Sequence, residues 1–294
     1  MQENSVVINA MITACQKAGG AIMRDFGELE NLQITSKGFN NFVSSADLKA
    51  ERIIINELQK FRPQYHIFSE ESGYIKPLSE TQSPADIPVA HYRWVIDPID
   101  GTSNFIHGNP AFAVCIALER VRIKPSNSQI MESIDLEAET IASVIYQPTS
   151  REFFYAEKNM GAFHVNSYWN KNKIKVAGRS EVASCLVGTL TNKALQIENE
   201  NKIFKLLSQN AVKWRISGSA ALDMAYLASG KYDIIIFPDK LVRWDIAPGF
   251  LLIHEAGGVF FDILDQSKIA NTFNVSCGLF ATNHLLAAKL TSRT

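Results

Sequence analysis

Two aspartates three residues apart, Asp97 and Asp100, have the type and spacing of ligands for a hard cation. They directly follow a strongly apolar run, so charge begins where a buried strand is expected to end. Pro98 between them restricts one φ angle, and Gly101 after them permits a tight turn. Such a turn can aim both carboxylates and the Ile99 carbonyl at one point, as a cation such as Mg²⁺ requires of its oxygen ligands.

The same residues also have an ordinary structural explanation, because aspartate beside proline or glycine commonly caps a turn or a helix. On the hexapeptide of residues 97–102 alone, the two interpretations carry equal weight. Further acids favour the metal site. Glu70 and Glu71 follow a second strand-like run, and Asp245 opens a late helical segment.

Hydrophobic periodicity predicts the elements that must position these acids. Apolar residues spaced four, three, four and four apart predict an amphipathic helix over residues 5–26 that stops at Gly27. A second helix is predicted to begin at a cap near Ser45 and to end on the approach to Pro63. Asp47 would then lie in its first turn.

From residue 66 onward, short strand-like runs alternate with helical segments, separated early on by polar connections at residues 79–90 and 120–140. No long Gly, Ser or Pro-rich linker divides the chain. A layered α+β or α/β domain over residues 1–294 is therefore predicted, made of two fused halves of about 1–150 and 151–294. Strands are expected near residues 66–68, 93–96, 113–118, 141–146, 185–188 and 232–237, and helices near residues 203–208, 219–229 and 244–255.

Composition excludes several classes of protein. A formal net charge of -1 over 294 residues offers no field that would attract bulk nucleic acid or a membrane, so local groups must bind any anionic ligand. No continuous apolar segment of the ~20 residues that span a bilayer is expected, and the N-terminus has no basic leader. Four widely spaced cysteines without a C-x-x-C pair indicate reduced thiols. A cytoplasmic protein without a membrane partner is predicted.

Three acidic segments together resemble the signature set of the inositol monophosphatase family. They are Ser69-Glu70-Glu71-Ser72, residues 94–105, and Trp244-Asp245-Ile246-Ala247 with Glu255-Ala256-Gly257-Gly258. Their order and spacing match, and the similarity extends over nearly the whole chain. Residues 25–27 and 42–47 most resemble the bacterial extragenic-suppressor (SuhB) branch. The resemblance implies a five-layer αβαβα sandwich of the inositol monophosphatase and fructose bisphosphatase type.

The resemblance also implies a metal site with two to three Mg²⁺ ions. Asp97 would bridge the first two ions, and a third, weaker ion would rest on Glu70 and water. Asp47 would share a water or polarise Thr102, although an acid in a first helical turn is also explained by the helix dipole. The ligands would be Glu70, Asp97, the Ile99 carbonyl, Asp100 and Asp245.

Catalytic roles by resemblance fall to Thr102, which would orient the attacking water, and to Asp47 and Glu70. Asp245 could accept a substrate hydroxyl as well as bind metal. Lys37 could approach the phosphate from a loop, although a lone loop lysine is usually just exposed. The phosphate and substrate contacts would come from two turns, with Gly101, Thr102 and Ser103 in one and Gly218, Ser219 and Ala220 in the other.

These residues imply hydrolysis of phosphate monoesters of inositol or a related polyol or sugar by a metal-activated water, without a covalent enzyme intermediate. Pro238 departs from the pattern, because inositol-specific relatives place a glutamate there, seven residues before Asp245. Loss of that hydroxyl acceptor predicts broader specificity.

Two alternatives stay open. One is another phosphatase of the superfamily, acting on fructose bisphosphate, histidinol phosphate or a nucleotide 3′-phosphate. The other is a SuhB-like protein that interacts with an RNA transcription complex, with RNA polymerase or an RNA-associated protein as its partner. Lithium sensitivity and a homodimer are implied by the resemblance alone.

Overall fold

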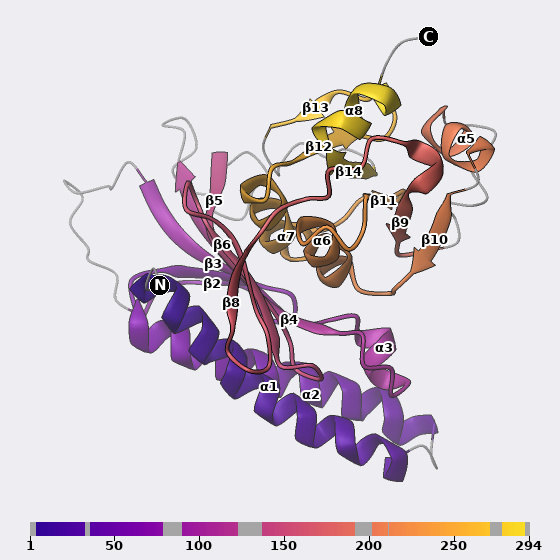
Figure 1. Ribbon diagram of the computed structural model, residues 1–294. Coiled ribbons are helices and arrows are strands. Elements are labelled where there is room, and N and C mark those ends of the chain that lie inside the picture. The colour runs from indigo at the N-terminus through magenta and orange to yellow at the C-terminus, as the bar shows by residue number, and fades with distance from the viewer. Residues whose placement is uncertain are drawn as a thin grey trace.

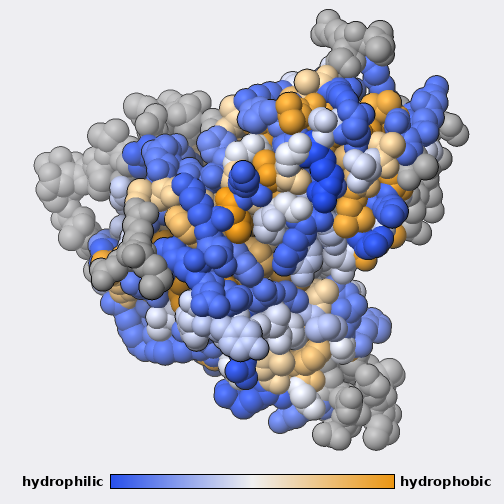
Figure 2. All heavy atoms as spheres, in the orientation of Figure 1, coloured by the Kyte–Doolittle hydropathy of each residue, from blue (hydrophilic) through white to orange (hydrophobic). Residues whose placement is uncertain are grey.

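The computed structural model describes residues 4–32, 36–78, 90–122, 137–191, 202–210, 212–270 and 278–291. Over these residues, helices and sheets alternate in layers (Figure 1). On the face seen in Figure 2, hydrophilic side chains predominate and hydrophobic ones occur in small separate patches. The outline is indented between the lobe that carries β10 and the lobe that carries α3 (Figures 1 and 2).

Two long helices, α1 (Val6–Leu32) and α2 (Ser36–Phe61), cover one face of an eight-stranded sheet (Figure 1). Its strand order is β2-β1-β3-β4-β5-β6-β7-β8, and its neighbours are antiparallel except for the parallel pair β1 and β3. The strands span His66–Ser69 (β1), Gly73–Ile75 (β2), Ala90–Asp100 (β3), Ala113–Arg122 (β4), Glu137–Gln147 (β5), Glu152–Glu157 (β6), Gly161–Val165 (β7) and Lys171–Ile174 (β8).

A six-stranded sheet forms the second β layer, in the order β10-β9-β11-β14-β12-β13. Helices α6 (Ala220–Ala228) and α7 (Arg243–Glu255) lie between the two sheets, and α5 (Lys202–Gln209) and α8 (His284–Thr291) cover the outer face. A short helix, α3 (Thr102–Ile106), follows β3, and a 3₁₀ turn spans Val182–Ser184. The strands span Leu186–Thr189 (β9), Lys213–Ile216 (β10), Ile234–Phe237 (β11), Gly258–Asp262 (β12), Lys268–Ile269 (β13) and Leu279–Asn283 (β14).

Three large hydrophobic cores lie between these layers and join them. The first joins α1 and α2 to the first sheet, through side chains such as Met11, Ile54 and Trp94. The second joins that sheet to α6, α7 and the second sheet, and the third lies under α5 and α8. The predicted layered α+β fold is therefore confirmed, with its layers in the order αβαβα.

The predicted end of the first helix and the predicted start of the second are wrong, whereas the first begins at Val6 and the second ends at Phe61, as expected. Helix α1 does not stop at Gly27 but continues to Leu32, because Phe26 packs against Phe105 and Phe112 and holds this end on the core. Tertiary packing here outweighs the roughly 1 kcal/mol cost of a helical glycine. Helix α2 begins at Ser36 rather than near Ser45.

The remaining predicted elements occur close to their expected positions. The elements that were not predicted are the strands β2, β6, β7, β8, β10, β12, β13 and β14 and the helix α8. The polar connection predicted at residues 120–140 is shorter, because β4 runs to Arg122 and β5 begins at Glu137. What joins these two strands lies outside the described residues.

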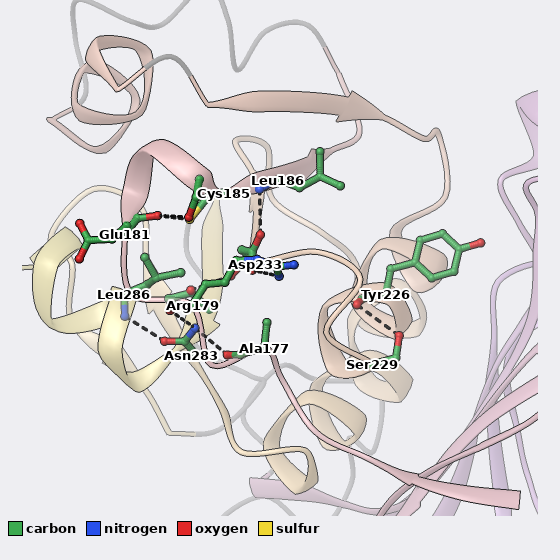
Figure 3. A network of polar contacts seen from close by, with 12 residues as sticks. Ala177, Arg179, Glu181, Cys185, Leu186, Tyr226, Ser229, Asp233, Asn283 and Leu286 are labelled. Carbon is green, nitrogen blue, oxygen red and sulfur yellow. Dashed lines mark hydrogen bonds and ion pairs between the residues drawn. The ribbon is translucent and has the colours of Figure 1, made fainter.

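The segment that crosses from the first sheet to the second is held by two buried polar side chains (Figure 3). Asp233 accepts from Arg179 Nη1 (2.7 Å) and from the amide of Leu186 (2.9 Å). Asn283 donates to the carbonyls of Ala177 and Arg179 at 2.8 and 2.9 Å. These contacts fix the path of the chain into β9, and thereby the position of the second sheet against α6 and α7.

Residues 6–28 of α1 are long and apolar enough, by length and composition only, to cross a membrane, and half of the stretch is buried in the fold. Its buried side packs in the first hydrophobic core, as a core helix of a folded domain does. Among the described residues, Cys15, Cys115 and Cys185 are buried free thiols, as predicted. Cys277 lies outside the described residues.

Candidate metal centre

Three buried or half-buried aspartates converge at the end of β3. Each of Asp97, Asp100 and Asp245 offers a carboxylate oxygen, and these three oxygens lie within 4.8 Å of one another. Asp97 and Asp100 are 2% and 7% exposed, because β3 runs through the core before it turns. Asp245 comes from the first turn of α7, the helix that packs against the same sheet.

The turn that presents Asp97 and Asp100 has the local geometry expected from its sequence. The β3–β4 register shifts between the two aspartates, and the amide of Ile99 donates to Asp97 Oδ1 at 3.0 Å. Gly101 has a φ of 91°, and a Cβ there would lie 3.0 Å from the carbonyl oxygen of Ala111. Glycine is therefore needed both for the backbone conformation and for space. The next residue begins α3.

Thr102 lies next to this turn, with its hydroxyl donating to the Ile99 carbonyl at 3.0 Å. That carbonyl is one of the predicted metal ligands, and a carbonyl oxygen has a second lone pair for another partner. Ser103 is exposed on the same short helix. The predicted water-orienting hydroxyl and the predicted carbonyl ligand are thus in direct contact.

A second turn, before α6, holds Asp100 from the other side. Ser219 donates its hydroxyl to Asp100 Oδ2, and the amide of Ala221 donates to the same oxygen at 3.1 Å. Ser219 also caps α6 by accepting from the amide of Leu222 at 3.2 Å. In the turn that was predicted to contact substrate, Ser219 therefore binds an acid of the cluster, and Ala220 is the first residue of α6.

Asn104 links the two turns. Its Nδ2 donates to the carbonyl oxygens of Ala111 (2.7 Å) and Ser217 (2.8 Å). Gly218 has a φ of 80°, and a Cβ there would come within 2.9 Å of Asn104 Nδ2. The sequence analysis assigned no role to Asn104, although this polar residue lies only two positions after Thr102.

Glu70 and Asp47 extend the acidic group away from the three aspartates. Glu70 follows β1, its amide donates to the Ile96 carbonyl at 3.1 Å, and its carboxyl group is close enough to that of Asp97 for each to shift the pKa of the other. Asp47, on α2, is 3% exposed and lies near Glu70 and Glu71. Asp47 thus belongs to the Glu70 side of the group.

Burial and mutual repulsion raise the pKa of every acid in this group. Burial raises the pKa of Asp97 well above its usual range, and Asp100, Glu70 and Asp245 add to the effect. Burial also raises the pKa of Asp245 to about 7, reinforced by Asp100 and Glu70. The pKa of Asp100 rises to about 6 through burial, and hydrogen bonds from Ser219 and the α6 amides limit that rise.

The pKa of Asp47 is raised to about 7, first by burial and then by Glu71, Glu70 and Glu51. Arg243 lies two residues before Asp245, but its guanidinium pairs with Glu119, with Nε 2.8 Å from Oε2. Clustered carboxylates that repel one another fit a bound cation, because a cation removes the repulsion and favours the charged forms. The all-oxygen donor set suits a hard ion such as Mg²⁺.

Two further residues that the sequence analysis discussed, Lys37 and Pro238, are not shown to contact the acidic group. Lys37 falls within helix α2 rather than in the predicted loop, and its side chain lies outside the described residues. Pro238 directly follows β11, and the neighbouring Asp239 is exposed.

Comparison with known proteins agrees with this arrangement. The family model described as "Inositol monophosphatase family" matches residues 3–293. The chain belongs to the inositol monophosphatase family. An inositol-1-monophosphatase of Rhizobium meliloti is 36% identical over 276 residues, which cover 93% of this chain and 92% of the relative. The Nus factor SuhB of Escherichia coli strain K12 is 34% identical over 275 residues, with 92% and 91% covered.

Solved structures of the family share the fold. The crystal structure of the extragenic suppressor protein suhB from Bartonella henselae has a TM-score of 0.72 and 32% identity, and 97% of each chain is covered. This chain is therefore a member of a phosphatase family, and it holds an acidic cluster that could bind a metal ion. Among the relatives above, one is named as a phosphatase and another as a Nus factor.

Proposed function

We propose that this chain hydrolyses phosphate monoesters of inositol or of related polyols and sugars in a magnesium-dependent reaction. The observation that carries the proposal is the convergence of Asp97, Asp100 and Asp245 within 4.8 Å, in a chain of the inositol monophosphatase family. The residues that would hold two to three Mg²⁺ ions are Glu70, Asp97, the Ile99 carbonyl, Asp100 and Asp245. Bound there, the ions would activate a water, neutralise the phosphate and stabilise the leaving alkoxide.

The chain's own groups would then bind and orient the reactants. The Thr102 hydroxyl, which donates to the Ile99 carbonyl, is placed to orient the attacking water, and Asp47 would hold a further water on the Glu70 side. The amides of Gly101 and Thr102 and the hydroxyl of Ser103 would bind phosphate oxygens. The turn of Gly218, Ser219 and Ala220, with Asp245, would contact the alcohol part of the substrate. No covalent enzyme intermediate is proposed.

The substrate range is proposed to be broad, because Pro238 cannot accept a hydrogen bond from a ring hydroxyl through its side chain. The test compares kcat/KM for inositol monophosphate, fructose bisphosphate, glycerol phosphate, histidinol phosphate and an adenosine 3′-phosphate. Similar values for inositol and other polyol phosphates would support the proposal. A large preference for inositol monophosphate would contradict broad specificity and leave the chemistry intact.

The reaction itself is tested by phosphate release with and without excess chelator. Asp97→Asn, Asp100→Asn and Asp245→Asn should each abolish turnover, because each removes a charged ligand from the cluster. Full turnover in excess chelator would refute magnesium dependence. Inhibition by lithium, a cytoplasmic location, a homodimer and a single catalytic domain over residues 1–294 belong to the same proposal.

A second candidate function is favoured by the names of the Nus factor relatives, and it is binding to a transcription complex that contains RNA polymerase or an RNA-associated protein. An Asp97→Asn protein separates the two functions. Recovery of transcription proteins with the variant, together with lost hydrolysis, would support a binding role beside the enzymatic one. Hydrolysis by the wild type without any such partner would leave the phosphatase function alone.

A further inference from the structure

Glu51, a buried carboxylate on α2, binds the loop of residues 69–72, which carries Glu70. We propose that Glu51 is a positioning residue that sets the metal affinity of the site by holding the loop of residues 69–72. The proposal rests on the proposed metal-dependent function. It adds a residue that hydrophobic periodicity and family motifs did not single out for any role.

Within the part of the chain that the structure describes, the side-chain hydrogen bonds of Glu51 all go to this one loop. Oε1 accepts from the hydroxyl of Ser69 and from the amides of Glu71 and Ser72, both at 3.1 Å. Oε2 accepts from the hydroxyl of Ser72. Glu51 is 2% exposed, so the loop replaces water as its hydrogen-bonding partner. A single side chain thus binds the loop on both sides of Glu70.

Among these hydrogen bonds to Glu51, none comes from Glu70, which lies between the anchored residues. Its amide donates to Ile96 of β3, and its carboxyl group is close enough to that of Asp97 for each to shift the pKa of the other. Residues 69, 71 and 72 are therefore anchored to α2 while Glu70 is directed to the cluster. Removing the anchor would free the loop and lower the chance that Glu70 and Asp97 meet at one ion.

A purely structural role would not call for a charged residue here. Hydrogen-bond acceptors for loop amides can come from neutral side chains, whereas a buried carboxylate beside Asp47, Glu70 and Glu71 adds repulsion. Charged acceptors form stronger hydrogen bonds, and a nearby cation would offset the repulsion. Groups that orient metal ligands typically change metal affinity 10–100-fold when removed.

The test is a titration of Mn²⁺ as the probe, followed by the electron paramagnetic resonance signal of the free ion, without substrate. We expect Glu51→Ala to weaken Mn²⁺ binding about 10–100-fold. Glu51→Gln keeps one acceptor oxygen and the shape of the side chain, and it should weaken binding less than alanine does. In activity assays, Glu51→Ala should raise the Mg²⁺ concentration for half-maximal rate by the same factor, with kcat at saturating Mg²⁺ within a few-fold of wild type.

Two controls separate positioning from general loss of stability. Glu57→Gln changes another α2 glutamate, one that pairs with Lys17 and Lys60 at the surface, and should leave Mn²⁺ binding unchanged. Ile203→Ala destabilises the core under α5, remote from the loop, and should lower Tm without changing Mn²⁺ affinity. A loss of affinity in Ile203→Ala equal to that in Glu51→Ala would overturn the positioning role.

The proposal also fails if folded Glu51→Ala binds Mn²⁺ as the wild type does. Should Glu51→Ala not fold, Ser72→Ala removes one hydrogen bond from an exposed loop residue and should still weaken Mn²⁺ binding a few-fold. An unchanged affinity of Ser72→Ala would then count against the proposal. A wild type that binds no Mn²⁺ would instead refute the proposed metal site itself.

Discussion

The carboxylate of Asp100 accepts a hydrogen bond from the hydroxyl of Ser219, a residue 119 positions later in the chain. The same oxygen, Oδ2, accepts from the amide of Ala221 at 3.1 Å. The end of β3 is therefore joined to the start of α6, the helix between the two sheets. One carboxylate oxygen of Asp100 is thereby held at the start of α6.

Ser219→Ala should lower both stability and activity. The lost helix cap costs about 1 kcal/mol, which corresponds to a fall in Tm of about 2–4 °C in a domain of this size. Asp100 also loses an orienting partner, so kcat/KM should fall about tenfold or more. Thermal unfolding and phosphate release measure the two effects. Ser229→Ala, at the other end of α6, removes a hydroxyl that donates to Ala225 and should leave kcat/KM unchanged.

Asp97→Asn should have opposite effects on activity and on the stability of the metal-free protein. Activity should fall by a factor on the order of a thousand, because the central carboxylate of the cluster is lost. In chelator, Tm should rise by a few degrees, because repulsion from Asp100, Glu70 and Asp245 is relieved. A lower Tm in chelator would contradict the electrostatic explanation. Asp265→Asn, on the surface, should change neither quantity.

The stability of the metal-free protein should fall as pH rises from about 4 to about 7. The pKa values of Asp47 and Asp245 are raised to about 7, and that of Asp100 to about 6, above the unfolded value near 3.9. The folded state therefore holds more protons in this window, and its advantage is lost as pH passes the folded pKa values. Magnesium needs the charged carboxylates, so its stabilising effect should grow over the same range.

Thermal unfolding between pH 5 and pH 8, in excess chelator and in excess Mg²⁺, checks this pH dependence. The two Tm curves should lie close together at the acidic end and diverge toward neutral pH. A constant gap between the curves would show that these carboxylates do not titrate together with metal binding.

Gly249→Ala should destabilise the contact between α7 and α6. A Cβ at Gly249 would lie 2.6 Å from the Cβ of Met224, and that atom cannot move without its backbone. Such overpacking typically costs about 1–3 kcal/mol, which denaturant unfolding would measure. Gly20→Ala on α1 is the matched control, because nothing lies within 4 Å of its added Cβ. That variant should gain about 0.5–1 kcal/mol from helix propensity.

Sequence reasoning predicted the turn after β3 because its determinants are local. The Ile99 amide binds Asp97, two residues away, and Gly101 is followed directly by α3. Periodicity also predicted the helices α1, α2, α5, α6 and α7 and the strands β1, β3, β4, β5, β9 and β11 of the layered fold. It placed the end of α1 wrongly, because a helical glycine is a weak local signal beside the packing of Phe26 on the core. It also placed the start of α2 wrongly, because a residue of the capping type does not always begin a helix.

The sequence by itself determined that acids follow the strand-like runs and open a late helix, and its motifs identified the family. Only the tertiary structure decided which acids meet and what holds them. Asp100 accepts a hydrogen bond from Ser219, at the start of α6. Glu51 accepts hydrogen bonds from a loop that lies about twenty residues later in the chain. Such contacts arise from the stacking of helices between two sheets, and no local propensity or spacing records that stacking.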